Sequence, residues 1–177
     1  MSRIGRRPIP LPEGVEVAVA DGFAKVKGPK GSLDIGIRDG LEVTVGDRQA
    51  KVARVGRVQK CHWGTLRANI ANAVHGVSIG FTYPLILDGP GYRARVEGTK
   101  LILRAGHSVE QELAIPEGVE VEITKLGLAV KGCDRQVVGS LADRVIKVRP
   151  ADPYKLRGIR RADIKVTRKK RRVVEAG

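Results

Sequence analysis

The sequence predicts an α+β protein with two homologous domains, each a small, mostly antiparallel sheet system packed on one helix, and a basic C-terminal arm. Three observations predict this fold class: a repeated segment, short alternating strands around glycine turns, and two stretches with helical periodicity. We place the first domain at residues 1–81, the second at 82–152 and the arm at 153–177. A chain of 177 residues is long enough for two small domains.

The repeat predicts an internal duplication. Residues 11–17 (LPEGVEV) recur as residues 115–121 (IPEGVEV), so that Pro12 and Pro116 are 104 positions apart. The same offset relates Val-Lys-Gly at residues 26–28 to Val-Lys-Gly at residues 130–132. Two matched blocks in one register indicate a duplicated domain, with a boundary near Phe81 and Thr82.

Alternating apolar residues predict the strands. After each Pro-Glu-Gly turn, valines recur at every second position and a glycine interrupts the pattern, which is typical of an antiparallel hairpin. In the first copy we expect further strands around residues 33–37, 41–45 and 50–55. In the second copy they precede the repeated segment, around residues 85–87, 92–97, 100–104 and 109–115.

Each copy also contains one segment with helical spacing. In residues 63–74, an apolar stripe includes Leu66, Ile70 and Val74, and Gly76 provides a stop. In the second copy, Asp134 caps a helix whose stripe runs from Val137 to Ile146, and Pro150 ends it.

The charge distribution separates the C-terminal segment from the rest. The net charge is +14, from 33 Lys and Arg against 19 Asp and Glu. Residues 1–81 carry +6, residues 82–149 carry +1 and residues 150–177 carry +7. Half of the net charge therefore lies in the last 28 residues. Such an excess favours a polyanionic partner, and the alternative is a solvated tail that only aids solubility.

Several function classes find no support in the sequence. No apolar run is long enough for a membrane helix, and no apolar stretch follows the basic start as in a secretory signal. We find no phosphate-binding loop, no serine-hydrolase motif and no zinc-site spacing, so we predict no enzyme activity, no cofactor and no metal site. A metal site assembled from distant residues stays open. Cys61 and Cys133 are more typical of reduced thiols than of a disulfide.

The C-terminal segment holds the candidate binding residues. Between residues 152 and 161, Pro153 fixes a turn, one aromatic residue and four cations follow, and Gly158 permits close backbone approach. Tyr154 is suited to stacking on a base or to packing on its own domain. Ile164 and Val166 alternate with Lys165, which predicts a short extended stretch. Residues 168–172 are five consecutive cations (RKKRR).

Six short motifs occur in order along nearly the whole chain. They are MSRIG at the start with Pro8 and Ile9, VKGPKG from residue 26, GTLRA from residue 64 with Asn72, GYRA from residue 91, GCDRQ from residue 132, and the loop of Tyr154, Lys155, Gly158 and Ile159. Together they resemble the bacterial large-subunit ribosomal protein L6 family. The chain departs from the family pattern at Trp63, at residues 105–110, at Ala151 and at Leu156, where the family has a small residue.

The resemblance implies two homologous domains, no enzymatic activity and a structural role in the large ribosomal subunit. It implies binding to 23S rRNA near the stalk base and the factor-binding region, with neighbouring large-subunit proteins and translational GTPases nearby. It further implies a ribosome-bound protein of the cytoplasm or of an organelle, with no membrane or small-molecule partner. The predicted rRNA-binding residues are Tyr154, Lys155, Arg157, Gly158, Arg160, Arg161, Lys165, Arg168, Lys169, Lys170, Arg171, Arg172, Arg3, Arg6 and Arg7.

Two other classes remain as alternatives at this point. A general DNA- or nucleoid-binding module would bind duplex DNA and structured RNA with similar affinity. A phosphate-handling enzyme with a site between the repeats would show turnover that one Asp or Glu substitution abolishes.

Overall fold

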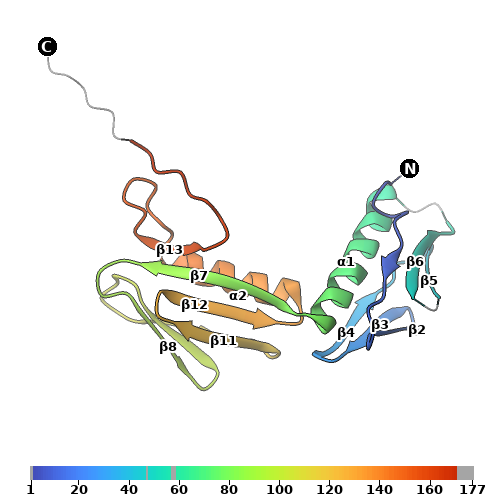
Figure 1. The fold of residues 1–177 in the computed structure, drawn as a ribbon, viewed down its shortest axis with the longest axis horizontal. Helices are drawn as coiled ribbons and strands as arrows, with labels where there is room; N and C mark the ends of the chain where they lie inside the picture. Colours follow the sequence, from blue (N-terminus) through green and yellow to red (C-terminus); the bar gives the residue numbers. More distant parts are fainter. Residues whose placement is uncertain (1, 47, 57–58, 171–177) are drawn as a thin grey trace, which may run out of the picture. The chain divides into compact units, whose positions relative to one another are not determined.

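A computed structural model describes residues 2–46, 48–56 and 59–170 of the chain (Figure 1). It contains two compact units. Unit 1 comprises the residues up to Phe81 together with Cys133–Arg135, and unit 2 comprises Thr82–Gly132 and the chain from Gln136 onwards. Both units combine antiparallel sheets with one long helix, so the predicted α+β class is confirmed.

Unit 1 consists of two three-stranded sheets and helix α1. One sheet has the strand order β1-β6-β5 and the other has the order β2-β3-β4, with antiparallel pairing throughout. The elements are β1 (Ile9–Pro10), β2 (Glu16–Ala20), β3 (Phe23–Gly28), β4 (Gly31–Gly36), β5 (Leu41–Val45), β6 (Gln49–Arg54) and α1 (Lys60–Ser78).

The core of unit 1 lies where both sheets meet the apolar stripe of α1. Ala24 and Val26 of β3 are fully buried, and the lysines that alternate with them point away, as the period of a strand requires. Ile70 and Val77 of α1 are also fully buried. Because β1 brings Ile9 into the same core, this two-residue strand is part of the fold although its pattern is too short to predict.

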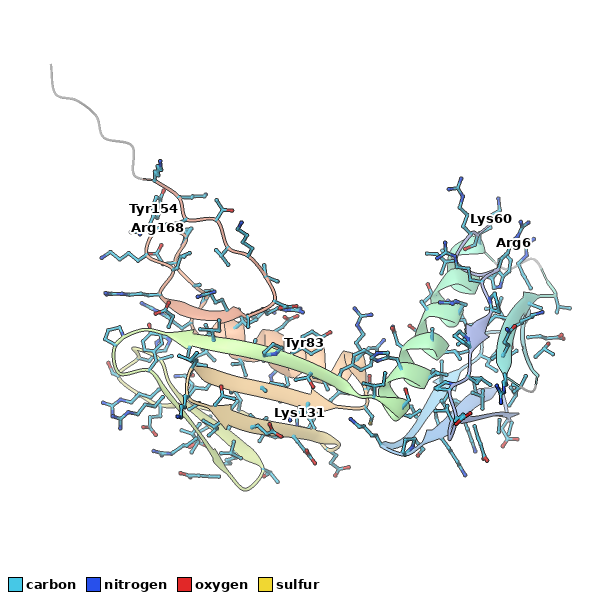
Figure 2. All side chains as sticks on the ribbon, viewed as in Figure 1. Arg6, Lys60, Tyr83, Lys131, Tyr154 and Arg168 are labelled. Atoms are coloured by element: carbon cyan, nitrogen blue, oxygen red, sulfur yellow. The ribbon has the colours of Figure 1, made fainter. Side chains whose placement is uncertain are left out.

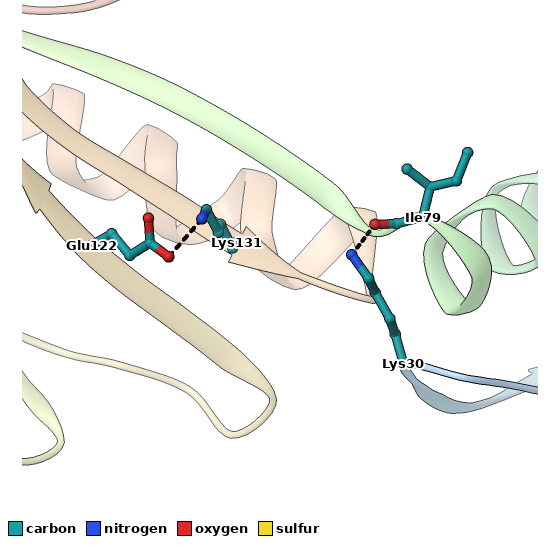
Figure 3. A network of polar contacts seen from close by, with 4 residues as sticks. All are labelled: Lys30, Ile79, Glu122 and Lys131. Carbon is teal, nitrogen blue, oxygen red and sulfur yellow. Dashed lines mark hydrogen bonds and ion pairs between the residues drawn. The ribbon is translucent and has the colours of Figure 1, made fainter.

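Helix α1 is longer than the predicted segment at both ends, and its C-terminal end is held by Lys30. The backbone N–H of Lys30 donates to the carbonyl of Val77 at 3.0 Å, and its ammonium group donates to the carbonyl of Ile79 (Figure 3). A cation at this end satisfies a carbonyl that has no partner within the helix and complements the helix dipole.

Unit 2 repeats this architecture with one additional strand. Its first sheet has the order β10-β9-β8, and its second has the order β11-β12-β7-β13. The elements are β7 (Phe81–Asp88), β8 (Arg93–Glu97), β9 (Lys100–Arg104), β10 (Gln111–Ala114), β11 (Val119–Thr124), β12 (Gly127–Gly132), α2 (Arg135–Val148) and β13 (Gly158–Arg161). Across the β11–β12 hairpin, Lys131 pairs with Glu122 at 2.5 Å (Figure 3).

Strand β13 corrects the prediction of an extended stretch around residues 164–166. The structure assigns no strand there, and the strand lies instead at Gly158–Arg161, antiparallel to β7. The reason is burial: Ile159 is 1% exposed in the core of unit 2, whereas Ile164 is 51% exposed. The alternation around Lys165 therefore does not mark a sheet face.

The order of strands aligns the two units at a different offset from the one that the repeated LPEGVEV segment predicted. In both units a three-stranded meander is followed by a hairpin and then directly by the helix, which equates β2-β3-β4 with β8-β9-β10 and β5-β6 with β11-β12. Gly40 and Gly118, with φ of +77° and +74°, precede equivalent strands at an offset of 78. The predicted offset of 104 instead joins β2-β3 to β11-β12, which are not equivalent hairpins.

Candidate nucleic-acid interface

The loop between α2 and β13 is closed by backbone hydrogen bonds. The N–H of Asp152 donates to the carbonyl of Arg157 at 2.9 Å, and the N–H of Leu156 donates to the carbonyl of Asp152 at 2.7 Å. The Asp152 carboxylate accepts the N–H groups of Tyr154 at 3.0 Å and Lys155 at 3.3 Å. Aspartate commonly stabilises a turn in this way. The turn leaves Tyr154 and Lys155 exposed at its tip.

Gly158, the first residue of β13, allows the two ends of this loop to lie close together. It is buried, has a φ of +139°, and a Cβ added to it would lie 2.5 Å from the Cα of Ala151. Gly158 therefore permits a close backbone approach, as expected, and the segment that approaches it is Ala151 of the same chain. Leu156 has a φ of +60°, a left-handed conformation that favours glycine.

The segment after β13 returns to the loop. The Arg168 guanidinium donates to the carbonyl of Tyr154 at 2.6 Å, and the N–H of Lys169 donates to the carbonyl of Pro153 at 3.0 Å. Figure 2 shows Tyr154 and Arg168 close together beyond β13. Five residues line a hollow of about 570 Å³, which we call the Tyr154 hollow: Tyr154, Lys155, Arg168, Lys169 and Lys170. Arg171 and Arg172, also predicted, lie outside the described residues.

Arg160 and Arg161 of β13 differ from the cations of the loop. Arg161 donates twice to Asp163, at 3.0 and 2.7 Å, and its guanidinium lies 4.5 Å from the centroid of the Tyr83 ring. The Arg161 guanidinium lowers the pKa of the Asp163 carboxyl through these hydrogen bonds. Arg160 is half-buried, and its Nε is buried without a hydrogen-bond partner within the described residues. Both arginines are thus constrained by the fold.

Most cations of the loop and of the segment after β13 carry uncompensated charge. Within residues 149–170, the side chains of Arg149, Lys155, Arg157, Lys165, Lys169 and Lys170 form no hydrogen bond or ion pair with another described residue. The sheet β10-β9-β8 differs, because Arg95 contacts both Glu97 at 2.8 Å and Glu110 at 2.9 Å. Arg95 and Lys100 of this sheet are thus paired with glutamates, whereas the cations gathered at the C-terminal loop are not, and the loop is a surface suited to phosphates.

The N-terminal cations form a separate group on unit 1. Arg3, Arg6 and Arg7 are exposed in a turn that packs on α1: a Cβ on Gly5 would lie 2.6 Å from the Trp63 ring. Arg67 of α1 donates to the carbonyls of Arg7 and Pro8, both at 3.1 Å. Figure 2 shows Arg6 and Lys60 at the same end of α1. The first turn of α1 contains no acidic residue, which leaves this end positive.

Three residues of these surfaces were missed by the sequence analysis: Lys60 beside the N-terminal turn, and Arg149 and Tyr92 beside the C-terminal loop. Arg149 could have been predicted from the sequence, because it directly precedes the Pro150 that ends the predicted helix and begins the basic loop. Tyr92 could not, since it is distant in sequence from every other residue of the loop.

The described residues give no sign of a metal site or a membrane helix. No group of three or more His, Cys, Asp or Glu residues within them is arranged to hold a metal ion. No described helix is long and apolar enough to cross a membrane. Cys61 and Cys133 are free thiols.

Comparisons with known proteins match nearly the whole chain. The family model described as ribosomal protein L6 matches residues 11–80 and again residues 89–162, one match in each unit. The large ribosomal subunit protein uL6 of Caulobacter vibrioides is 42% identical over 174 residues, which is 96% of this chain and 97% of that protein. The proteins of the same name from Syntrophomonas wolfei and Crocosphaera subtropica are 41% and 40% identical over 172 residues, at 96% of each chain.

Proposed function

This chain belongs to the ribosomal protein L6 family, whose members are structural proteins of the ribosome and not enzymes, and from that premise we propose a specific site for it. It binds 23S rRNA of the large subunit near the stalk base, beside the region where translational GTPases dock. Neighbouring large-subunit proteins are its further partners, and unit 1 supplies surface for them. It acts as a ribosome-bound protein of a bacterial cytoplasm, with an organellar ribosome as the alternative location.

The single observation that carries this proposal is the C-terminal loop. Its backbone is fixed by the Asp152 carboxylate and by the returning Arg168, while Lys155 and Arg157 have no carboxylate partner within the described residues. A rigid loop that presents uncompensated cations binds phosphates with little loss of conformational entropy. A tail that served only solubility would not require this hydrogen-bonded frame.

We propose three tiers of RNA contact. The ordered contact comes from the loop and β13, where Gly158 shapes the backbone and Arg161 contributes through the edge left free by Asp163. A more adaptable contact comes from Lys165 and residues 168–172, and a lesser one from Arg3, Arg6 and Arg7 in unit 1. In this assignment residues 1–81 and 82–152 are the two repeats and residues 153–177 are the rRNA-binding arm. The ordered contact consists of Tyr154, Lys155, Arg157, Arg160 and Arg161.

The mechanism is electrostatic attachment followed by recognition of shape. Each cation that neutralises a phosphate releases condensed counterions, which favours binding and makes it dependent on salt. Because side chains cannot read the deep major groove of an RNA helix, the folded units discriminate by the shape of the RNA and by its unpaired regions.

Competition binding tests the proposal against a general DNA-binding module. The full chain is bound to fragments of 23S rRNA and challenged with small-subunit rRNA of the same length and with duplex DNA. We expect one 23S fragment to resist both competitors at physiological salt. Equal competition by duplex DNA would overturn the proposal and favour the general nucleic-acid binder.

A further inference from the structure

A second hollow is also lined by Lys155. It measures about 470 Å³ and is lined by Tyr92 and by three cations, Arg149, Lys155 and Arg157, from a segment distant in sequence from Tyr92. We call it the Tyr92 hollow. Lys155 also lines the Tyr154 hollow, so the two hollows flank one lysine. A volume of this order is in the usual range for binding a small ligand.

The Tyr92 ring is held in place by two glycine turns. A Cβ on Gly89 would lie 2.7 Å from the ring, and a Cβ on Gly106 would lie 3.3 Å from its hydroxyl. The ring also packs against the core of unit 2 while remaining half-buried. A ring fixed in this way loses little rotamer freedom when a flat ligand stacks on it.

The charge inside the Tyr92 hollow is positive. Its carboxylate, Asp152, already accepts the N–H groups of Tyr154 and Lys155. Within the described residues, no ion pair involves Arg149, Lys155 or Arg157. The hollow thus combines one aromatic ring with cations that lack a counter-charge. This combination matches a nucleotide, which has a flat base and a negative phosphate.

Resting on the proposed function, we propose that the Tyr92 hollow binds one unpaired nucleotide of the RNA. The base stacks on Tyr92, Arg149 and Arg157 contact its phosphate, and Lys155 contacts the next phosphate of the strand, at the boundary with the Tyr154 hollow. A paired helix places its phosphates outside and keeps its bases stacked inside, so it would leave the ring of Tyr92 without a partner.

Substitution at Tyr92 separates stacking from charge. The full-length variants Tyr92→Leu and Tyr92→Phe are titrated with the 23S fragment that the wild-type chain prefers, over a series of salt concentrations. Loss of one base stack in Tyr92→Leu lowers affinity about 5- to 150-fold without changing the salt slope. Tyr92→Phe keeps the ring and retains the affinity. Unchanged affinity in Tyr92→Leu would overturn the inference.

A matched pair of charge variants tests the phosphate contact. Arg149→Gln removes one cation of the Tyr92 hollow, and Lys125→Gln removes one exposed cation from the β11–β12 turn. We expect Arg149→Gln to reduce the salt slope by about 0.7–0.9 and Lys125→Gln to leave it unchanged. Equal slopes for the two variants would show that Arg149 contacts no phosphate and would contradict the inference.

A measurement on the wild-type chain avoids any effect of substitution on folding. The chain has three tyrosines, so ring-labelled tyrosine gives a simple NMR spectrum. On binding the preferred 23S fragment, we expect the Tyr92 ring signals to move upfield, the direction that stacking on a base produces. A shift of the Tyr154 ring signals with unchanged Tyr92 signals would overturn this inference and leave the proposed function standing. If the wild-type chain prefers no 23S fragment, the proposed function itself fails.

Discussion

Gly158 occupies a position that no other residue fits without strain. Its φ is +139°, and an added Cβ would approach the Ala151 backbone within 2.5 Å. We expect Gly158→Ala to lower the free energy of unfolding by about 1–3 kcal/mol, because backbone must shift to remove the clash. Denaturant unfolding measures the change.

Gly139 is the matched control for this substitution. It lies within α2, and a Cβ there would have no neighbour within 4 Å. Gly139→Ala should therefore raise the free energy of unfolding by about 0.5–1 kcal/mol, since alanine loses less backbone entropy in a helix. Equal effects of the two alanine substitutions would contradict the role assigned to Gly158.

The pairing of Arg161 with Asp163 makes the contribution of this carboxyl to stability dependent on pH. Hydrogen bonds from Arg161 lower its pKa below the ordinary value of 3.8. A carboxyl with a lowered pKa stabilises the folded state above its ordinary pKa, and the contribution is lost as the pH falls through the lowered value. We expect NMR titration of Asp163 to show a midpoint below 3.8 in the wild type and a return to the ordinary range in Arg161→Gln. Identical midpoints would contradict the pairing.

Residue types in the C-terminal segment were readable from the sequence, but their pairing was not. The density of Lys and Arg indicated the loop, and the structure places Tyr154 and Lys155 at its tip. Whether Arg161 is free or paired depends on side-chain conformation and on Tyr83 from a distant strand. Tyr92 was missed for the same reason, because the fold brings it to the loop from outside the basic segment.

At the scale of the elements, the turn before β13 depends on Asp152. Asp152→Ala removes an acidic residue from a phosphate-binding surface, and by charge alone it should strengthen RNA binding. We expect the opposite, a loss of about five-fold in affinity, because the Tyr154 and Lys155 N–H groups lose their acceptor and the loop loses its order. Filter binding to the preferred 23S fragment measures it.

Glu117→Ala is the control for Asp152→Ala. Glu117 is an exposed acidic residue of the turn before β11, and its removal changes the net charge equally. We expect this variant to bind as well as the wild type or slightly better. Tighter binding by Asp152→Ala than by Glu117→Ala would show that the carboxylate acts only through its charge.

Strand patterns predicted most elements of both units, and the exceptions have physical causes. The strand at Leu41–Val45 and the strand at Lys100–Arg104 have the predicted bounds. Strand β13 was missed because one apolar residue, Ile159, attaches it to the core. The repeat register was misread because similar segments begin at Gly14, Gly40 and Gly118, and the longest match joins non-equivalent strands.

At the scale of the whole molecule, the cations differ in whether they are paired with carboxylates. On the sheet β10-β9-β8, Lys100 pairs with Glu112 at 2.9 Å, and the pair lowers the pKa of that glutamate. At the C-terminal loop, cations such as Lys155 and Arg157 have no ion-pair partner within the described residues. The net charge along the sequence therefore indicated the segment that we propose as the RNA contact, and the structure shows which of its cations are paired and which are not.

The cut that tests the C-terminal contact must spare the fold. A chain ending at Pro150 would lose β13 and with it Ile159 from the core of unit 2. A chain ending at Val166 keeps β13 and removes five cations, residues 168–172. This shorter deletion spares β13 and the core of unit 2, and it removes the hydrogen bonds of Arg168 and Lys169 to the loop together with the cations.

The most direct measurement is the salt dependence of binding to the preferred 23S rRNA fragment, for the full chain and for the chain ending at Val166. If all five removed cations contact phosphates, the slope of log affinity against log salt flattens by about 3.5–4.5 units. We predict a flattening of several units for the rRNA fragment, with thermal unfolding of the shortened chain unchanged. An unchanged slope, with rRNA and duplex DNA bound equally well, would contradict the account.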